Sequence, residues 1–193
     1  MQKTNIKQHI VNVASKLFYT QGYNATGINE IIAKSEIAKA TLYHHFKSKE
    51  DICIAYLEQR HKIFLGALKE FTDKANKGRP QLICIFDYLR NSYREGEFHG
   101  CWAIKTLSEL PPQNQKILTV IQRQKKELLL FLGEVVGDNI ANISIAETEK
   151  ISGGIYLLYE SAITETHLHK NDWPIHLAKS LAPSLFAEAQ LVN

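Results

Sequence analysis

The sequence predicts an all-α protein with a small N-terminal domain, residues 1–48, and a larger helical domain, residues 49–193. Apolar residues recur at intervals of three and four, and the alternation typical of strands is nearly absent. Glycine, proline and capping residues divide the chain into about nine helical segments. Residues 1–50 contain seven lysines and three acidic residues, whereas the other 143 contain 16 basic and 17 acidic residues. This asymmetry indicates a module that faces nucleic acid joined to a near-neutral one.

Three short helices are predicted in the first domain. The first covers about residues 4–21, from Thr4, and ends at a glycine that suits a C′ position. The second opens at Thr26 or Gly27, and the third spans residues 39–45 after a turn at Ser35-Glu36. Three short helices with a tight turn between the second and third predict a helix-turn-helix.

The residues from 36 to 50 divide into two sets. Ile37, Leu42 and Phe46 recur at about one helical turn and can anchor one face. The outward set holds cations, a hydroxyl, a phenol and an imidazole, without a carboxylate: Lys39, Thr41, Tyr43, His44, Lys47 and Lys49. Such groups suit a surface that meets phosphates and base edges. The alternative for Tyr43 is that it merely packs against the first helix.

Residues 10–57 resemble the DNA-binding domain of TetR-family transcriptional regulators. The resemblance rests on Phe18, Gly22-Tyr23, Thr26, Ile31, Thr41-Leu42-Tyr43-His44-His45-Phe46 and Lys49-Glu50. It implies that the major groove is faced by Lys39, Ala40, Tyr43 and His44. It implies phosphate contacts for Thr26, Thr41, His45 and Lys49. Asn29, early in the second helix, is a further candidate for a base contact.

Two positions depart from the family pattern. Glu36 stands where members usually have glycine, and it strains the turn if its φ is positive. Ala38 stands where members usually have Ser or Thr, which removes a helix N-cap typically worth about 1 kcal/mol. We expect neither change to abolish the motif.

The second domain is predicted to contain six further helices. They cover about residues 49–75, 79–94, 101–110, 112–136, 145–169 and a last segment capped by Asp172. The helix from Pro112 follows a Pro-Pro break, and Pro183 is expected to kink or split the last helix. The stretch from Gly100 to Leu110 resembles a segment of many ligand-binding domains of the family.

Aromatic and aliphatic residues on five of these helices are candidates for the wall of a ligand pocket. They are Phe64, Leu68, Phe86, Leu89, Tyr93, Trp102, Leu107, Phe131 and Tyr156. Because no Lys or Arg falls among them, we expect a small, mostly apolar inducer. The alternative is that each residue belongs to an ordinary core.

Two apolar stripes are candidates for a homodimer interface. The first comprises Ile151, Ile155, Leu158 and Ala162, and the second Leu177, Leu181 and Leu185. Two helices from each subunit would form a four-helix bundle, and two-fold symmetry would match a palindromic operator in double-stranded DNA.

Other classes of function have weak support. No catalytic motif is present, so we predict no enzymatic activity and no cofactor. The pair His44-His45 is a poor metal site because adjacent helical side chains point about 100° apart, and we predict no metal. No run approaches the roughly 18 apolar residues of a membrane helix, so we expect no membrane contact and a cytoplasmic protein.

The sequence therefore predicts a ligand-responsive transcriptional repressor that a small molecule releases from its operator. One alternative is a helical small-molecule-binding protein, or an enzyme, without DNA binding. Another is a thiol-based redox regulator, which requires Cys84 or Cys101 to be exposed and to have a lowered pKa.

Overall fold

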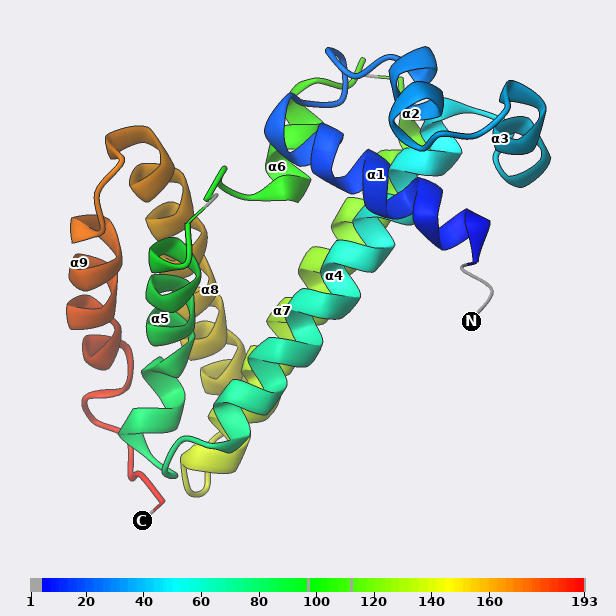
Figure 1. Cartoon of the computed structure of the whole chain (residues 1–193). Helices are drawn as coiled ribbons and strands as arrows, with labels where there is room; N and C mark the ends of the chain where they lie inside the picture. The colour runs from blue at the N-terminus through cyan, green and yellow to red at the C-terminus, as the bar shows by residue number, and fades with distance from the viewer. Residues whose placement is uncertain (1–4, 97, 112, 193) are drawn as a thin grey trace. The chain divides into compact units, whose positions relative to one another are not determined.

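The computed structural model describes residues 5–96, 98–111 and 113–192, and this part of the chain is almost entirely helical (Figure 1). Nine α-helices and one 3-10 helix are present within these ranges, and the one bridge between extended segments joins Ile140 and Leu191. The prediction of an all-α fold is confirmed. Two compact units emerge, each described below by itself.

The first unit comprises residues 5–63 and 102–124. It contains α1 (Ile6–Thr20), α2 (Ile28–Lys34), α3 (Lys39–His45), the first part of α4 (Lys49–Asp73), α6 (Trp102–Ser108) and the start of α7 (Gln115–Asn139). Its buried core draws on Ile10, Ala14, Phe18, Ile31, Leu42, Phe46, Ile52 and Tyr56. The boundary expected after residue 48 differs from this division because α4 continues without a break from one unit into the other.

The ends of the first helices follow from local capping. The side chain of Asn5 accepts a hydrogen bond from the amide of Lys7 and caps α1. The expected helix start at Thr4 lies outside the described residues. Gly22 ends α1 with a φ of 103°, a conformation that favours glycine. Of the two expected starts of α2, the structure has Gly27 as the N-cap.

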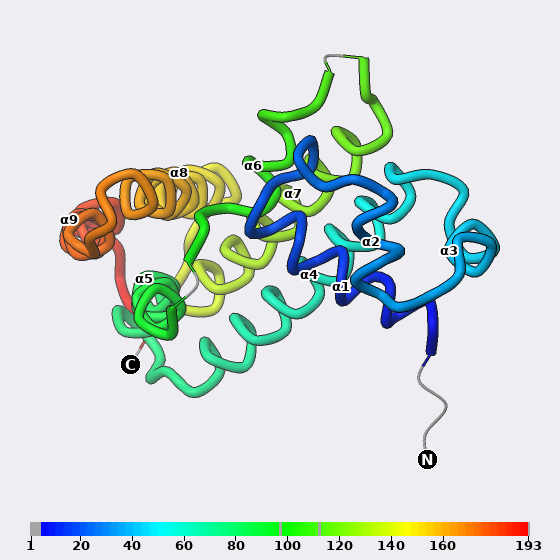
Figure 2. The backbone as a smooth tube through the Cα atoms, turned by 45° about the horizontal axis from the view of Figure 1, so that its top comes forward, coloured from blue at the N-terminus to red at the C-terminus, as the bar shows by residue number. Residues whose placement is uncertain are grey.

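The second unit comprises residues 64–101 and 125–192 within the described ranges. It contains the remaining parts of α4 and α7, together with α5 (Arg79–Arg94), α8 (Ile145–His169), α9 (Trp173–Leu181) and the 3-10 helix η1 (Ala182–Phe186). Helices α5, α8 and α9 stand side by side, as Figures 1 and 2 both show. A capping box starts α8, because Ser144 and Glu147 bond to each other's backbone amides.

Several predicted helix boundaries shift by a few residues. The break expected at Pro183 is confirmed, since α9 ends at Leu181 and a 3-10 helix follows. The helix expected from 101 to 110 is shorter, and α7 begins at Gln115; its expected start at Pro112 lies outside the described residues. None of the described helices is both long and apolar enough to cross a membrane.

A buried asparagine ties three segments of the second unit together. Asn139 is fully buried, and its side-chain oxygen accepts a 2.6 Å hydrogen bond from the amide of Gly78. Its side-chain nitrogen donates to the Gln81 side chain and to the Val135 carbonyl, both at 2.7 Å. Its own carbonyl accepts from the amide of Val192 at 3.0 Å. A single polar side chain therefore satisfies backbone groups at the start of α5 and the end of α7.

Candidate nucleic-acid interface

The outward face of α3 carries the residues expected to face the major groove. Lys39, Ala40, Tyr43 and His44 are all exposed, and the Tyr43 side chain is 42% exposed. Leu42, on the opposite face, is fully buried. The exposure of Tyr43 favours the outward role over the alternative that it merely packs against the first helix. Among its seven residues, α3 has no carboxylate that would repel a phosphate.

The other predicted contact residues on α2 and α3 are at least partly accessible. Asn29 is exposed on the first turn of α2, and Thr41 and His45 are half-buried. The ring of His45 meets that of His44 edge-on, with 5.1 Å between centroids. Lys47, two residues beyond the end of the helix, is exposed; the sequence places it in the outward set without assigning it a contact. Its position just beyond α3 makes it a phosphate candidate.

Two predicted phosphate ligands have a different role. Thr26 is fully buried, and its hydroxyl donates a 2.7 Å hydrogen bond to the carbonyl of Gly22. The ammonium of Lys49 donates to the carbonyls of Tyr23 and Thr26 at 2.9 and 3.1 Å and lies 4.2 Å from the centre of the Tyr23 ring. Burial lowers the pKa of Lys49. Both side chains therefore hold the loop after α1, which corrects the expectation that they face phosphates.

The turn between α2 and α3 has the strain expected from its sequence. Glu36 adopts a φ of 53°, in the left-handed region. Its amide donates to the Ala33 carbonyl at 3.2 Å, and the amide of Ile37 donates to the Ile32 carbonyl at 3.4 Å. Ala38 is the N-cap of α3 and makes no side-chain capping bond. The unfavourable backbone of Glu36 is thus held by the bonds that close α2.

Residues of α6 and the segment after it fix the end of α1 and the loop that follows. The ammonium of Lys105 donates to the carbonyls of Tyr19 and Thr20, at 2.8 and 3.1 Å. A cation at this place satisfies terminal carbonyls and favours the negative end of the helix dipole. The carboxylate of Glu109 accepts from the amide of Asn24 at 2.6 Å. The sequence did not predict that Glu109 would hold this loop. The available signal was its position in the stretch that resembles the family's ligand-binding domains.

The nine residues expected to line a pocket are divided between the two units. Trp102 and Leu107 belong to the first unit and the other seven to the second. Four of the seven are buried members of the hydrophobic core, namely Leu68, Phe86, Leu89 and Phe131. Phe64, Tyr93 and Tyr156 are partly buried and pack against that core. For the four buried residues the structure favours the alternative, an ordinary core.

The expected dimer stripe on α8 faces the interior of its own chain. Ile151, Ile155 and Ala162 are buried in the core, and Leu158 packs against it. In the 3-10 helix η1, Leu185 also turns inward and packs on Gly154, where a Cβ would lie 2.8 Å from the leucine side chain. For the buried residues Ile151, Ile155 and Ala162, the structure favours a place in the core of the chain over a subunit interface.

The outer surface of α8 and α9 carries a different set of apolar side chains. Leu157 and Leu168 on α8 are each 67% exposed. Leu177 and Leu181 on α9, both predicted interface residues, are each 48% exposed, and Trp173 is 47% exposed. The expectation for α8 differs from the structure because this helix is apolar on two faces, and sequence spacing alone does not say which one is covered.

The three thiols differ in their surroundings. Burial raises the pKa of Cys84, and it raises that of Cys53 to about 12. Cys84 is therefore neither exposed nor lowered in pKa, as a redox thiol would have to be. Cys101 is half-buried, and the ammonium of Lys125 donates to its sulfur at 3.3 Å and to the Glu160 carboxylate at 2.5 Å. Over the described ranges, no three potential metal-binding side chains converge on one point.

Comparison with known proteins shows which family the sequence resembles. Residues 10–56 match the bacterial regulatory proteins of the tetR family. The HTH-type transcriptional repressor NemR of Escherichia coli (strain K12) is 18% identical over 186 residues, 94% of each chain. The HTH-type transcriptional regulator QacR of Staphylococcus aureus (strain Mu50) is 47% identical over 53 residues, 28% of each chain.

Solved structures agree over nearly the whole chain. A TetR-family transcriptional regulator from Streptomyces coelicolor superposes with a TM-score of 0.84 at 17% identity, covering 95% of both chains. The reduced form of Escherichia coli NemR superposes with a TM-score of 0.83 at 17% identity, covering 93% of this chain and 96% of that one. Residues 10–56 therefore match the tetR family of bacterial regulatory proteins, and solved TetR-family structures share the fold of nearly the whole chain.

Proposed function

We propose that the protein is a ligand-responsive, DNA-binding transcriptional regulator that acts as a repressor. The observation that carries the proposal is the exposed face of α3, where Lys39, Tyr43 and His44 stand together without a carboxylate. The relatives support it, because NemR is named a transcriptional repressor and QacR a transcriptional regulator. Such a protein acts in the cytoplasm, where the bacterial chromosome lies.

The contacts divide into those that read bases and those that position the protein. Lys39, Ala40, Tyr43 and His44 face the major groove from α3, and Asn29 reaches it from the first turn of α2. Thr41, His45 and the exposed Lys47 bind phosphates on either side. Phosphate contacts fix the register of the recognition helix, whereas contacts to base edges give sequence preference.

The functional form is a homodimer. Its interface uses the exposed apolar side chains of α8 and α9: Leu157, Leu168, Trp173, Leu177 and Leu181. An apolar patch shared by two neighbouring helices indicates a protein contact, and two copies of it form a four-helix bundle. Two-fold symmetry places two α3 helices against two half-sites, so the operator is palindromic.

A small, mostly apolar molecule acts as the inducer. It binds the second unit and shifts the population of the dimer toward a form that does not fit the operator. The rival proposal, a helical binding protein or enzyme without DNA binding, gives no reason for an exposed α3 face that is cationic and lacks a carboxylate.

Fluorescence anisotropy with labelled DNA tests the proposal. Fragments of the neighbouring genomic DNA and a random duplex are titrated with wild type, Tyr43→Ala and a control, Leu130→Ala, which removes an exposed α7 side chain. Tyr43→Ala is expected to weaken operator binding about tenfold and random binding far less. The control should behave as wild type. If no fragment binds wild type better than random DNA, the rival proposal stands instead.

A further inference from the structure

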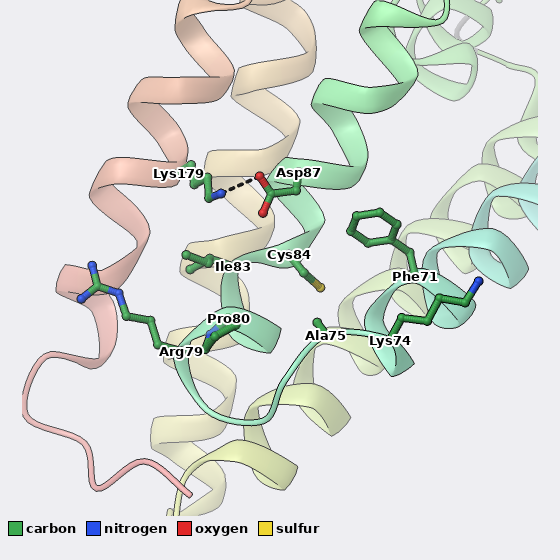
Figure 3. A pocket seen from close by; sticks show the side chains of 9 residues that line it. All are labelled: Phe71, Lys74, Ala75, Arg79, Pro80, Ile83, Cys84, Asp87 and Lys179. Atoms are coloured by element: carbon green, nitrogen blue, oxygen red, sulfur yellow. Dashed lines mark hydrogen bonds and ion pairs between the residues drawn. The ribbon is translucent and has the colours of Figure 1, made fainter. Parts of the chain in front are cut away.

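A cavity in the second unit lies apart from the residues expected to hold the inducer. Its volume is about 470 Å³, within the range of roughly 300–1,000 Å³ typical of small-molecule sites. The last turn of α4 and the residues after it form one wall, the first turns of α5 the floor, and α9 contributes Lys179 (Figure 3). None of the nine predicted pocket residues lines it.

The lining is apolar inside and charged at the rim. The apolar contribution comes from Phe71, Ala75, Pro80, Ile83 and Cys84. In Figure 3 the Phe71 ring and the Cys84 sulfur lie on the side of α4, opposite Lys179. Burial raises the pKa of Cys84, which therefore stays a neutral thiol and adds to the apolar surface.

The charged groups at the rim do not cancel. The ammonium of Lys179 donates to Asp87 at 2.5 Å, and that of Lys74 pairs with Glu70 at 2.6 Å. Arg79 remains, exposed at the start of α5, and no ion-pair partner for its guanidinium exists in the described part of the chain. Among the described residues, the cavity thus combines an apolar interior with one arginine at its rim that takes part in no ion pair.

We propose that this cavity binds a small amphipathic carboxylate with a single negative charge. The apolar body lies against Pro80 and Ile83, with Phe71 and Ala75 on the far wall. The carboxylate accepts hydrogen bonds from the Arg79 guanidinium, which extends on the Ile83 side of the cavity in Figure 3. Arginine presents a planar pair of donors that matches a carboxylate, and such charge-assisted bonds are stronger than neutral ones. An amine would meet the same cation at the mouth, and a neutral ligand would gain no charge-assisted bond from the guanidinium.

Binding joins segments from three helices of one unit. The site draws on the end of α4, the start of α5 and the middle of α9, so a bound ligand stabilises their packing. The site adds a second class of ligand, an acid, to the mostly apolar inducer proposed above. The proposal of a carboxylate site rests on the geometry of this cavity alone. Because ligand binding is measured without DNA, the result is independent of the proposed function.

Isothermal titration calorimetry with 2-naphthoate tests the site on the full chain. Arg79→Gln removes the exposed charge and is expected to weaken binding about tenfold. Ala75→Trp fills the cavity from a partly exposed position after α4 and should abolish binding. The matched control, Arg94→Gln, removes an exposed arginine at the other end of α5 and should bind as wild type.

A second ligand separates charge from hydrophobicity. The neutral alcohol 2-naphthalenemethanol should bind wild type about tenfold more weakly than the acid does, and Arg79→Gln should leave its affinity unchanged. Circular dichroism confirms that each variant is folded. Equal affinity for the acid in wild type and Arg79→Gln, or binding that survives in folded Ala75→Trp, overturns the proposal.

Discussion

The amide nitrogen of Asn24 lies 2.6 Å from a carboxylate oxygen of Glu109, and the side-chain amide of Asn24 donates to the Glu109 carbonyl at 2.8 Å. These residues are 85 positions apart, and they join the loop before α2 to the segment after α6. Gly22 lets the Glu109 carboxylate approach this loop, because a Cβ at position 22 would clash with the carboxylate. The entry to the helix-turn-helix is therefore held by a residue far outside it.

Glu109→Ala is expected to loosen this loop without unfolding the unit. A hydrogen bond to a charged group contributes about 1.5–3 kcal/mol, so amide exchange in residues 22–27 should accelerate by about tenfold or more. Glu109→Gln keeps an acceptor and should show a smaller increase. Hydrogen–deuterium exchange with mass spectrometry measures both. Unchanged exchange in Glu109→Ala would show that the loop is held by its other contacts.

Lys49 and Lys47 are expected to respond differently to replacement by methionine. Lys49→Met removes the donor to two carbonyls and should lower the free energy of unfolding by about 1–2 kcal/mol. Lys47→Met, at an exposed position, should change stability by less than about 0.5 kcal/mol. It should instead reduce the salt dependence of DNA binding by about one phosphate contact. Urea unfolding and salt titrations of operator binding distinguish the two. The opposite pattern would return Lys49 to the phosphate contacts.

Glu36→Gly should stabilise the protein by roughly 0.5–1 kcal/mol. The φ of 53° is strained for glutamate and readily adopted by glycine, although glycine loses more backbone entropy on folding. Thermal unfolding measures the gain, and Glu30→Gly is the control. That control lies in the first turn of α2 and should be destabilised. If Glu36→Gly were less stable than wild type, the inference that the Glu36 backbone is strained would be wrong.

Leu157→Glu should convert the proposed dimer into monomers. The exposed side chain lies in the middle of the proposed interface on α8, where two copies would place like charges in an apolar contact. Ile63→Glu is the control, because Ile63 is 61% exposed on α4 and belongs to the other unit. Light scattering reports the mass of each. A Leu157→Glu protein that remains dimeric would place the interface elsewhere.

Stability should fall as the pH rises above about 9. The pKa of Cys53 rises from 9.0 to about 12 in the folded chain, mainly because burial disfavours the thiolate. Between these values only the unfolded chain releases the proton, so the free energy of unfolding decreases by up to about 1.4 kcal/mol per pH unit. Tyr23, whose pKa is raised to about 12, adds to the loss above pH 10.

The variant Cys53→Ala isolates the thiol contribution. Its free energy of unfolding should depend less on pH than that of wild type just above pH 9, where Tyr23 is still mostly protonated in both states. Lys49, whose pKa is lowered by burial, acts in the opposite direction, and its electrostatic interaction with Cys53 is part of the difference that the variant measures. Urea unfolding at several pH values measures the difference. Equal slopes would mean that Cys53 ionises as freely in the folded chain as in the unfolded one.

Local sequence signals predicted the helices and the exposed face of α3 because they depend on neighbours a few residues apart. The capping pair Ser144 and Glu147 and the break at Pro183 are of this kind. The role of Lys49 depends on carbonyls of a loop more than 20 residues away, and that of Thr26 depends on its burial. Sequence spacing reveals neither. The covered face of α8 likewise depends on which helices pack against it.

The Asn139 contacts also bear on the order in which the second unit folds. Asn139 meets Gly78 across 61 residues of sequence, and it also accepts the amide of Val192. Closing loops of this length reduces chain entropy before any bond compensates, so such contacts form late in folding. The capping box of α8 involves residues three apart and can form at once. Assembly of this unit is thus expected to start from its individual helices and to reach its transition state before the asparagine closes the bottom of the bundle.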